Sequence, residues 1–247
     1  MTCVLLCAAC VVYCHGNAGS RVDALSLLPI LLRELQRPSL LTSRTWPLLV
    51  SSFTIASSIA WPCMSKLTRP PRPRFISLAM GVGVFAMDFA GAGQSEGKFL
   101  SLGYHEKDDL ATAVEYLVAC PKVTRIGVWG HSMGACTCLM YAGNGGGEHL
   151  SGMVLDSSFS TLDAAISETA AMAKQRLGED GGAGAGVAYV PDMLIPLAIG
   201  GIRRSIISQA QFDIRDVRPL ELCPEIYVPA MFGHGREDEI VAPYHSR

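Results

Sequence analysis

The sequence has few charged residues for its length and no excess of either sign. Charged residues make up 17% of the 247 residues, the formal net charge is −2, and neither half carries a long run of like charge. Proteins that bind nucleic acid usually present a basic field, so we expect no nucleic-acid partner. The 49% hydrophobic content is typical of a globular protein. We expect residues 1–247 to form a single domain around one core.

Signals for export or membrane insertion are also weak. Residues 1–13 are apolar but lack a basic leading segment, so a signal peptide is not expected. Residues 46–64 carry no charge and have the length of a membrane helix, but five serines and threonines and two prolines interrupt them. We do not favour a membrane span. We expect a cytoplasmic protein, with 46–64 as the one candidate for membrane association.

The nine cysteines lack the pattern of a disulfide framework or a metal site. Their number is odd in a chain too large to depend on cross-links, which favours reduced thiols. Cys7 and Cys10 form a C-x-x-C, but the segment is expected to be a strand, where residues three apart point to opposite faces. No second pair at metal spacing follows. We therefore expect no metal and no cofactor.

Short apolar runs alternate with helix-like segments, which is the pattern of βαβ units around a parallel sheet. The runs are apolar on both faces, as in strands that are covered by helices on both sides. The predicted strands are 10–14, 83–88, 125–129, 152–156 and 227–233. The predicted helices are 21–35, 105–118 and 133–142. The fold class is therefore α/β, a mostly parallel sheet with helices on both faces.

Two regions interrupt this alternation. Residues 36–80 have no clear period and are long for one crossover, so we expect an atypical insert without regular structure. Residues 178–186 form a low-complexity link inside a helix-prone region. We expect residues 157–219 to form a small helical cap. Its apolar stretch, 193–199, suits an acyl chain and a protein core equally well.

The strongest chemical signal is the G-x-S-x-G pentapeptide Gly130-His131-Ser132-Met133-Gly134, between a strand-like and a helix-like segment. A serine at such a turn adopts a strained backbone that raises its hydroxyl above the sheet. Glycines two residues before and after it prevent clashes in the tight turn. The N-terminus of the following helix favours developing negative charge. We predict Ser132 as a nucleophile supported by Gly130 and Gly134.

A second motif, His15-Gly16-Asn17, directly follows the first predicted strand. Acyl transfer needs two N–H donors directed at the carbonyl oxygen that becomes an anion. We expect one donor from the backbone of Met133 and the other from the backbone of Asn17. His15 and Gly16 are expected to support the loop, and His15 to brace it rather than to act as a base.

Three adjacent carboxylates, Glu237, Asp238 and Glu239, follow the last predicted strand. The triad acid lies at such a place in the chain order Ser…Asp…His, where it holds the imidazole in the right tautomer. The residues alone leave the choice among the three open, and the alternative is a solvated acidic turn. The glycine-rich loop 88–97 lacks a P-loop lysine and the G-x-G-x-x-G spacing, so we interpret it as a rim loop with a structural Asp88.

In this order the segments VVYCHGNAGS, IGVWGHSMGA and FGHGREDEIVAPYHS resemble the α/β-hydrolase superfamily. Within it they are similar to the serine aminopeptidase S33-like branch and its uncharacterised hydrolases of plants and protists. The resemblance covers residues 10–35 and 81–247. It implies an oxyanion loop at Asn17, a nucleophile at Ser132, and Asp238 as the acid among the three carboxylates. It also implies an acyl-enzyme that hydrolyses an ester, thioester or peptide bond of a small-molecule or acyl substrate.

The resemblance further implies strands ahead of residue 10 and a catalytic histidine well beyond the acid. Only nine residues follow Asp238, and His245 among them matches a helix start of the family rather than the catalytic position. Residues 36–80 have no counterpart. We therefore expect a chain truncated at both ends that turns over negligibly. The alternative is a catalytically dead binding protein of the same fold. Nothing in the sequence indicates the oligomeric state.

Overall fold

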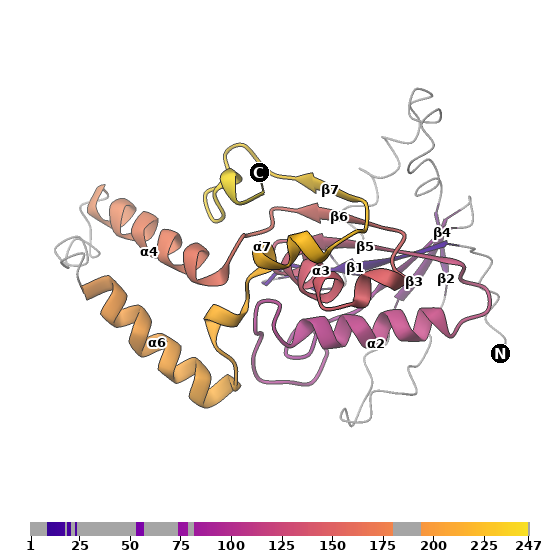
Figure 1. Cartoon of the computed structure of the whole chain (residues 1–247), viewed down its shortest axis with the longest axis horizontal. Helices are drawn as coiled ribbons and strands as arrows, with labels where there is room; N and C mark the ends of the chain where they lie inside the picture. The colour runs from indigo at the N-terminus through magenta and orange to yellow at the C-terminus, as the bar shows by residue number, and fades with distance from the viewer. Residues whose placement is uncertain are drawn as a thin grey trace.

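The computed structural model of the chain describes residues 9–17, 19–20, 23, 53–56, 74–78, 82–179 and 194–246. A seven-stranded sheet runs through them in the order β2-β3-β4-β1-β5-β6-β7 (Figure 1). The strands are β1 (Ala9–Cys14), β2 (Phe53–Ala56), β3 (Arg74–Leu78), β4 (Val82–Ala86), β5 (Arg125–His131), β6 (Gly152–Asp156) and β7 (Ala230–Gly233). The helices are α2 (Glu106–Val118), α3 (Met133–Gly143), α4 (Leu162–Glu179), α6 (Leu194–Ala210) and α7 (Pro219–Leu222).

The parallel part of the sheet confirms the predicted α/β fold class. β4, β1, β5, β6 and β7 are parallel neighbours, and they correspond to the five predicted strands. The bounds differ most at β7, which begins at Ala230 rather than at residue 227. Pro229 explains this difference, because proline has no N–H to donate to a ladder and its carbonyl only accepts from Met153. β4 ends at Ala86, and Asp88 belongs to the loop that follows.

Two strands lie inside 36–80, which corrects the expectation of an insert without regular structure. β2 pairs antiparallel with β3, and β3 pairs antiparallel with β4, so they extend that edge of the sheet. β2 also falls within the membrane-helix candidate 46–64, whose other residues lie outside the described part. Across the residues that the structure describes, no helix is long and apolar enough to cross a bilayer. The helix predicted at 21–35 lies outside the described residues except for residue 23.

The main core lies between the sheet and the helices α2 and α3, which share one face of it (Figure 1). Alternate strand residues point to this face. Val12, Phe85 and Val128 on three neighbouring strands pack with Leu110 and Leu117 of α2, and each of them is almost completely buried. The core therefore fixes β1, β5 and α3 together, and these are the elements that carry the predicted nucleophile and its loop.

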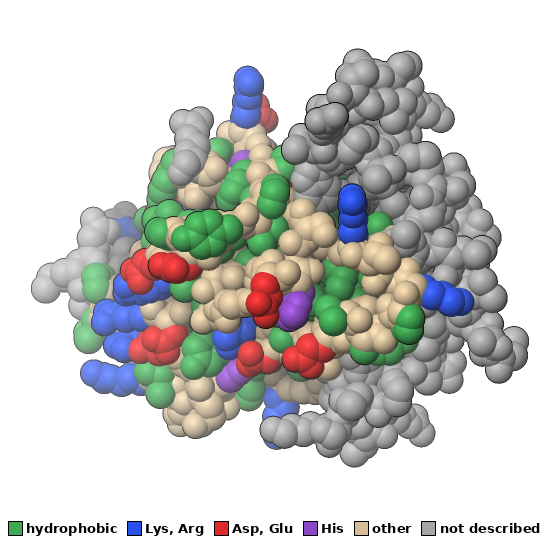
Figure 2. Space-filling model, turned by 45° about the vertical axis from the view of Figure 1, so that its right-hand side comes forward, with side chains coloured by type: hydrophobic (Ala, Val, Ile, Leu, Met, Phe, Trp, Pro, Cys, Tyr) green, Lys and Arg blue, Asp and Glu red, His purple; other side chains and the backbone are tan. Residues whose placement is uncertain are grey.

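Two long helices, α4 and α6, lie between β6 and β7 in the chain, within the region where the sequence predicts a cap. They lie side by side and run in opposite directions, beyond the carboxyl ends of the strands (Figure 1). A second apolar cluster joins them to α3, through Leu162 of α4, Phe212 after α6, and Cys136. On the face that Figure 2 draws, acidic and basic side chains of the described residues are interspersed.

An ion pair fixes the carboxyl end of α6. Nε of Arg203 donates to Oδ1 of Asp213 at 2.7 Å, and a second guanidinium nitrogen pairs with Oδ2. Asp213 in turn accepts from the N–H of Arg215 and so caps the short 3-10 helix Ile214–Asp216. The hydrogen bond from Arg203 is the main cause that lowers the pKa of Asp213 from 3.8 to about 2.

This lowered pKa predicts how the stability of the cap depends on pH. Because the folded pKa lies below the ordinary value, the pair stabilises the fold fully above about pH 4 and is lost as the pH falls through about 2. The urea midpoint of Asp213→Asn should therefore lie below that of the wild type at pH 6 and approach it near pH 2. Asp216→Asn, in the same turn, is the control. A deficit that does not change with pH would contradict the prediction.

Candidate active site

Ser132 lies at the turn between β5 and α3 with a strained backbone. Its φ of 51° and ψ of −114° are values that residues other than glycine rarely adopt. Its N–H donates to the carbonyl of Asp156 at 2.7 Å. Its carbonyl accepts from the N–H groups of Ala135 at 3.0 Å and Cys136 at 3.1 Å. These bonds hold Ser132 at the start of α3, where the residue is partly exposed to solvent.

Gly130 and Gly134 occupy positions where a side chain has no room. A Cβ on Gly134 would lie 2.5 Å from the carbonyl carbon of Cys14, the last residue of β1. A Cβ on Gly130 would likewise meet the backbone of Gly134 and Ala135. Gly134 therefore allows α3 to pack directly against β1, and Gly130 allows the end of β5 to lie against the first turn of α3. This packing brings the loop after β1 to the turn at Ser132.

The loop after β1 carries Asn17, the predicted oxyanion residue. β1 and β5 are parallel neighbours that pair through Cys14 and Gly130, so both loops leave the same edge of the sheet. A Cβ on Gly16 would lie 2.9 Å from Nδ1 of His131, the residue before the serine. The N–H of Met133 belongs to the first turn of α3, and such groups have no partner within their helix. Met133 thus follows Ser132 in the chain, and the loop that carries Asn17 leaves the same sheet edge beside His131.

His15 braces this loop from inside the protein. It is completely buried, and its Nδ1 lies 2.8 Å from the carbonyl oxygen of Gly16. Its Nε2 accepts from the N–H of Phe89 at 3.2 Å, which places the proton on Nδ1. The imidazole therefore joins the loop after β1 to the loop after β4. Both nitrogens are engaged, and this geometry favours the bracing role over a catalytic one.

Asp238 is the carboxylate of the acidic run that points inward. Its side chain is 18% exposed, whereas the two neighbouring glutamates are exposed. Its Oδ1 accepts from the N–H groups of Ile240 and Val241, each at 2.9 Å. Burial acts to raise the pKa of Asp238, but these bonds and the Ser157 hydroxyl outweigh it, so the pKa lies below its ordinary value. The residue is thus held as a carboxylate at the end of β7.

All six histidines of the sequence lie within the described residues, and none hydrogen-bonds the hydroxyl of Ser132. Beyond His15, each of the other five contacts another polar group. His105 contacts Ala210, His131 contacts Asp156, and His149 contacts Glu148. His234 contacts Val241, Asp238 and Ser246, and His245 contacts Ser160 and Glu168. His245 in particular is committed to the cap, with Nε2 2.9 Å from Glu168 of α4. The described residues therefore leave Ser132 without an imidazole partner.

Asp156 and Ser157, at the end of β6, also belong to the site, although neither was predicted from the sequence. The Asp156 carboxylate lies 3.9 Å from Nε2 of His131, and its carbonyl holds the N–H of Ser132. Ser157 has a φ of 53°, another strained value, and its hydroxyl supports Asp238. The signal in the sequence was the polar run DSSFS directly after a buried strand. The two residues bridge the loops of the predicted nucleophile and acid.

In the described part of the chain, no three histidine, cysteine or carboxylate side chains lie close enough together to hold a metal ion. Cys14, Cys120, Cys136, Cys138 and Cys223 in that part are thiols that form no disulfide. Cys7 of the C-x-x-C lies outside the described residues.

Comparison with known proteins identifies the family. Residues 56–181, just over half of the chain, match the model of the alpha/beta hydrolase fold family. The chain belongs to the α/β-hydrolase-fold family. One curated relative of this α/β hydrolase is the uncharacterized protein YqkD of Bacillus subtilis (strain 168), 30% identical over 166 residues. That match covers 66% of this chain and 48% of YqkD, so the chain spans about half the length of this relative.

Two solved structures share the fold of this chain. The esterase Pf2001 of Pyrococcus furiosus is 20% identical with a TM-score of 0.53, over 97% of this chain and 66% of that chain. Est1E of Butyrivibrio proteoclasticus, solved with ferulic acid bound, is 17% identical with a TM-score of 0.52, over 97% of this chain and 73% of that chain. At these identities the likeness is one of fold.

Proposed function

We propose that this α/β hydrolase cleaves an ester, thioester or peptide bond through an acyl-enzyme at Ser132. The observation that carries the proposal is the strained turn at Ser132, since such a backbone costs on the order of 1–3 kcal/mol and persists where the surrounding structure imposes it. Membership of a hydrolase family and fold neighbours that include esterases support it. We place the protein in the serine aminopeptidase S33-like branch, with a small-molecule or acyl substrate and a cytoplasmic location.

The proposed reaction assigns a step to each group of the site. The Ser132 hydroxyl attacks the carbonyl carbon, and the oxygen that becomes negative accepts from the N–H groups of Met133 and Asn17. The alcohol, thiol or amine leaves, and water then hydrolyses the acyl-enzyme. Asp238 would orient an imidazole that removes the serine proton and passes it to the leaving alcohol, thiol or amine. Because none of the six histidines reaches Ser132, we propose that this chain alone retains only residual catalysis, about 10³-fold over water.

Labelling with a fluorophosphonate tests the nucleophile directly. We expect one slow adduct, found on Ser132 by mass spectrometry, and faster labelling when free imidazole supplies the missing base. Ser132→Ala should abolish the adduct. Ser160→Ala is the matched control, because the Ser160 hydroxyl lies 2.8 Å from Nδ1 of His245. Ser246→Ala is a second control, because the Ser246 hydroxyl lies 2.7 Å from Nδ1 of His234. An adduct that survives Ser132→Ala and disappears in Ser160→Ala would overturn the proposal.

A second candidate function is ligand binding without turnover, and the engagement of all six histidines elsewhere favours it. This function predicts no adduct at Ser132 at any imidazole concentration. It also predicts that a bound ester raises the melting temperature equally in the wild type and in Ser132→Ala. A Ser132 adduct that forms faster with imidazole would exclude it.

A further inference from the structure

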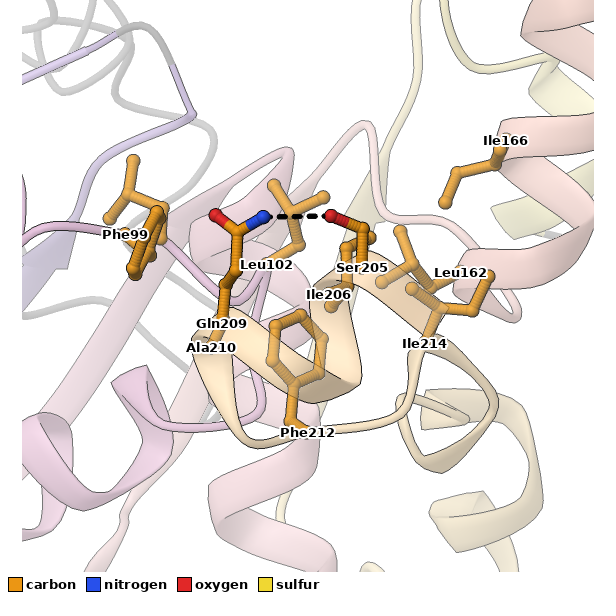
Figure 3. A pocket seen from close by; sticks show the side chains of 11 residues that line it. Phe99, Leu102, Leu162, Ile166, Ser205, Ile206, Gln209, Ala210, Phe212 and Ile214 are labelled. Carbon is orange, nitrogen blue, oxygen red and sulfur yellow. Dashed lines mark hydrogen bonds between the residues drawn. The ribbon is translucent and has the colours of Figure 1, made fainter. Parts of the chain in front are cut away.

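An open apolar pocket lies between the cap and the rest of the protein. It has a volume of about 170 Å³. Its walls are α4, α6 and the loop before α2, with Phe99, Leu102, Leu162, Ile166, Ile206 and Phe212 among the lining side chains (Figure 3). We infer that this pocket binds the acyl chain, about six carbons long, of the ester that the proposed function assigns to Ser132.

The lining shows that the ligand group is apolar. Among the described residues that line the pocket none is charged, and the two polar side chains bond one another, Nε2 of Gln209 donating to Oγ of Ser205 at 2.8 Å (Figure 3). A charged or strongly polar group placed among the remaining aliphatic and aromatic side chains would lose its hydration without compensation. An uncharged hydrocarbon group has no hydrogen bonds to water that it would lose in the pocket.

The volume sets the length of that group. A cavity of about 150 Å³ lined by leucine, isoleucine and phenylalanine accepts benzene, which has about six carbons. The pocket is slightly larger than this reference. The pocket is open to solvent, because Phe99 at its wall is 50% exposed. A protein core of the same composition would be close-packed and would leave no cavity of this size. A chain of about six carbons fits this space, whereas a long fatty chain exceeds it.

The position of the pocket relates it to the nucleophile. Leu162, Phe212 and Ile214 of its lining belong to one buried cluster with Cys136. Cys136 is one turn after Ser132 on α3, about 6 Å along the helix axis. The loop that carries Leu102 packs on the same turn, where Gly103 approaches the backbone of Cys136 and Thr137. Residues that line the pocket therefore pack against the first turn of α3, which begins directly after Ser132.

Polar contacts hold both walls of the pocket in place. On one side, the buried carboxylate of Glu106 accepts from Ser101 and Gly103 and fixes the loop around Leu102, whose φ is 58°. On the other side, the His105 ring bonds the carbonyl of Ala210 at the end of α6, at 3.1 Å. The pocket is thus preformed, which lowers the cost of binding a flexible chain.

The chain-length dependence of acylation tests the inference. With imidazole added, p-nitrophenyl acetate, butyrate, hexanoate and dodecanoate should acylate Ser132 at rates that rise by roughly fourfold per methylene up to hexanoate and fall for dodecanoate. Ile206→Trp fills the pocket and should remove most of the preference for hexanoate over acetate, a loss on the order of 100-fold. Ile206→Ala should move the optimum to a longer chain. The matched control is Ile207→Trp, on the neighbouring, exposed residue outside the lining.

A binding measurement separates failure of the pocket from failure of the proposed function. In Ser132→Ala, ligand-observed NMR should detect methyl hexanoate but not methyl acetate, and the added substitution Ile206→Trp should remove the hexanoate signal. If Ser132 is never acylated but this binding pattern holds, the pocket stands and the hydrolase proposal fails. If Ser132 is acylated at equal rates by acetate and hexanoate, and Ile206→Trp changes nothing, the pocket assignment is overturned and the hydrolase stands.

Discussion

Gly134→Ala should prevent the protein from reaching its native fold. The added Cβ would lie 2.9 Å from the Cβ of Cys14 and closer still to its carbonyl group. Cys14 cannot move away easily, because it ends a central strand that pairs with β4 on one side and β5 on the other. The first turn of α3 would have to separate from β1. We expect a loss of about 4–5 kcal/mol or more, a large part of the stability of an ordinary domain.

Urea unfolding followed by circular dichroism measures this loss. The matched control is Gly201→Ala on the exposed side of α6, where a Cβ would meet no atom within 4 Å. There the alanine should raise the free energy of unfolding by about 0.5–1 kcal/mol, since it restricts the unfolded chain and favours the helix. A Gly134→Ala midpoint near that of the wild type would show that α3 does not pack directly on β1. The placement of Ser132 beside the Asn17 loop would then be wrong too.

The contrast between these two glycines explains what the sequence could reveal about the fold. Gly134 was predictable because its role depends on neighbours within one motif, a strand, a tight turn and a helix. The parallel strands were predictable because each is a short apolar run between polar turns. β2 and β3 were not, since FTIA and RFISL are brief segments in a region without period. They become strands only through pairing with each other and with β4, and such long-range pairing leaves no local pattern.

The same distinction holds for the candidate site. Ser132 and its glycines come from a local motif, and Asp238 comes from its place after a late strand together with the family resemblance. The partner of His245 could not be foreseen, because Glu168 lies 77 positions away on a helix whose direction the sequence does not fix. Asp156 was visible as the end of a strand, but its carbonyl bond to Ser132 depends on the parallel pairing of β5 with β6.

Glu106→Ala should cause the second-largest loss of stability. This carboxylate is 2% exposed and accepts three hydrogen bonds, from the N–H of Ser101 at 2.7 Å, its hydroxyl at 2.5 Å, and the N–H of Gly103 at 2.8 Å. Alanine would leave these donors buried without partners, at about 1–3 kcal/mol for each before the loop relaxes. We expect a net loss of about 3–5 kcal/mol in urea unfolding.

Two further variants show whether the lost acceptors cause the effect. Asp108→Ala changes the same first turn of α2, but its side chain is 72% exposed, so only a dipole interaction and an exposed ion pair with Lys107 are lost, about 1 kcal/mol together. Glu106→Gln keeps the shape of the side chain but replaces one acceptor oxygen by an NH₂ group that faces donors. It should therefore restore only part of the stability. If glutamine restored all of it, shape rather than hydrogen bonding would hold the loop. Because Leu102 lies between the two bonded residues, a loosened loop would also open the wall of the acyl pocket.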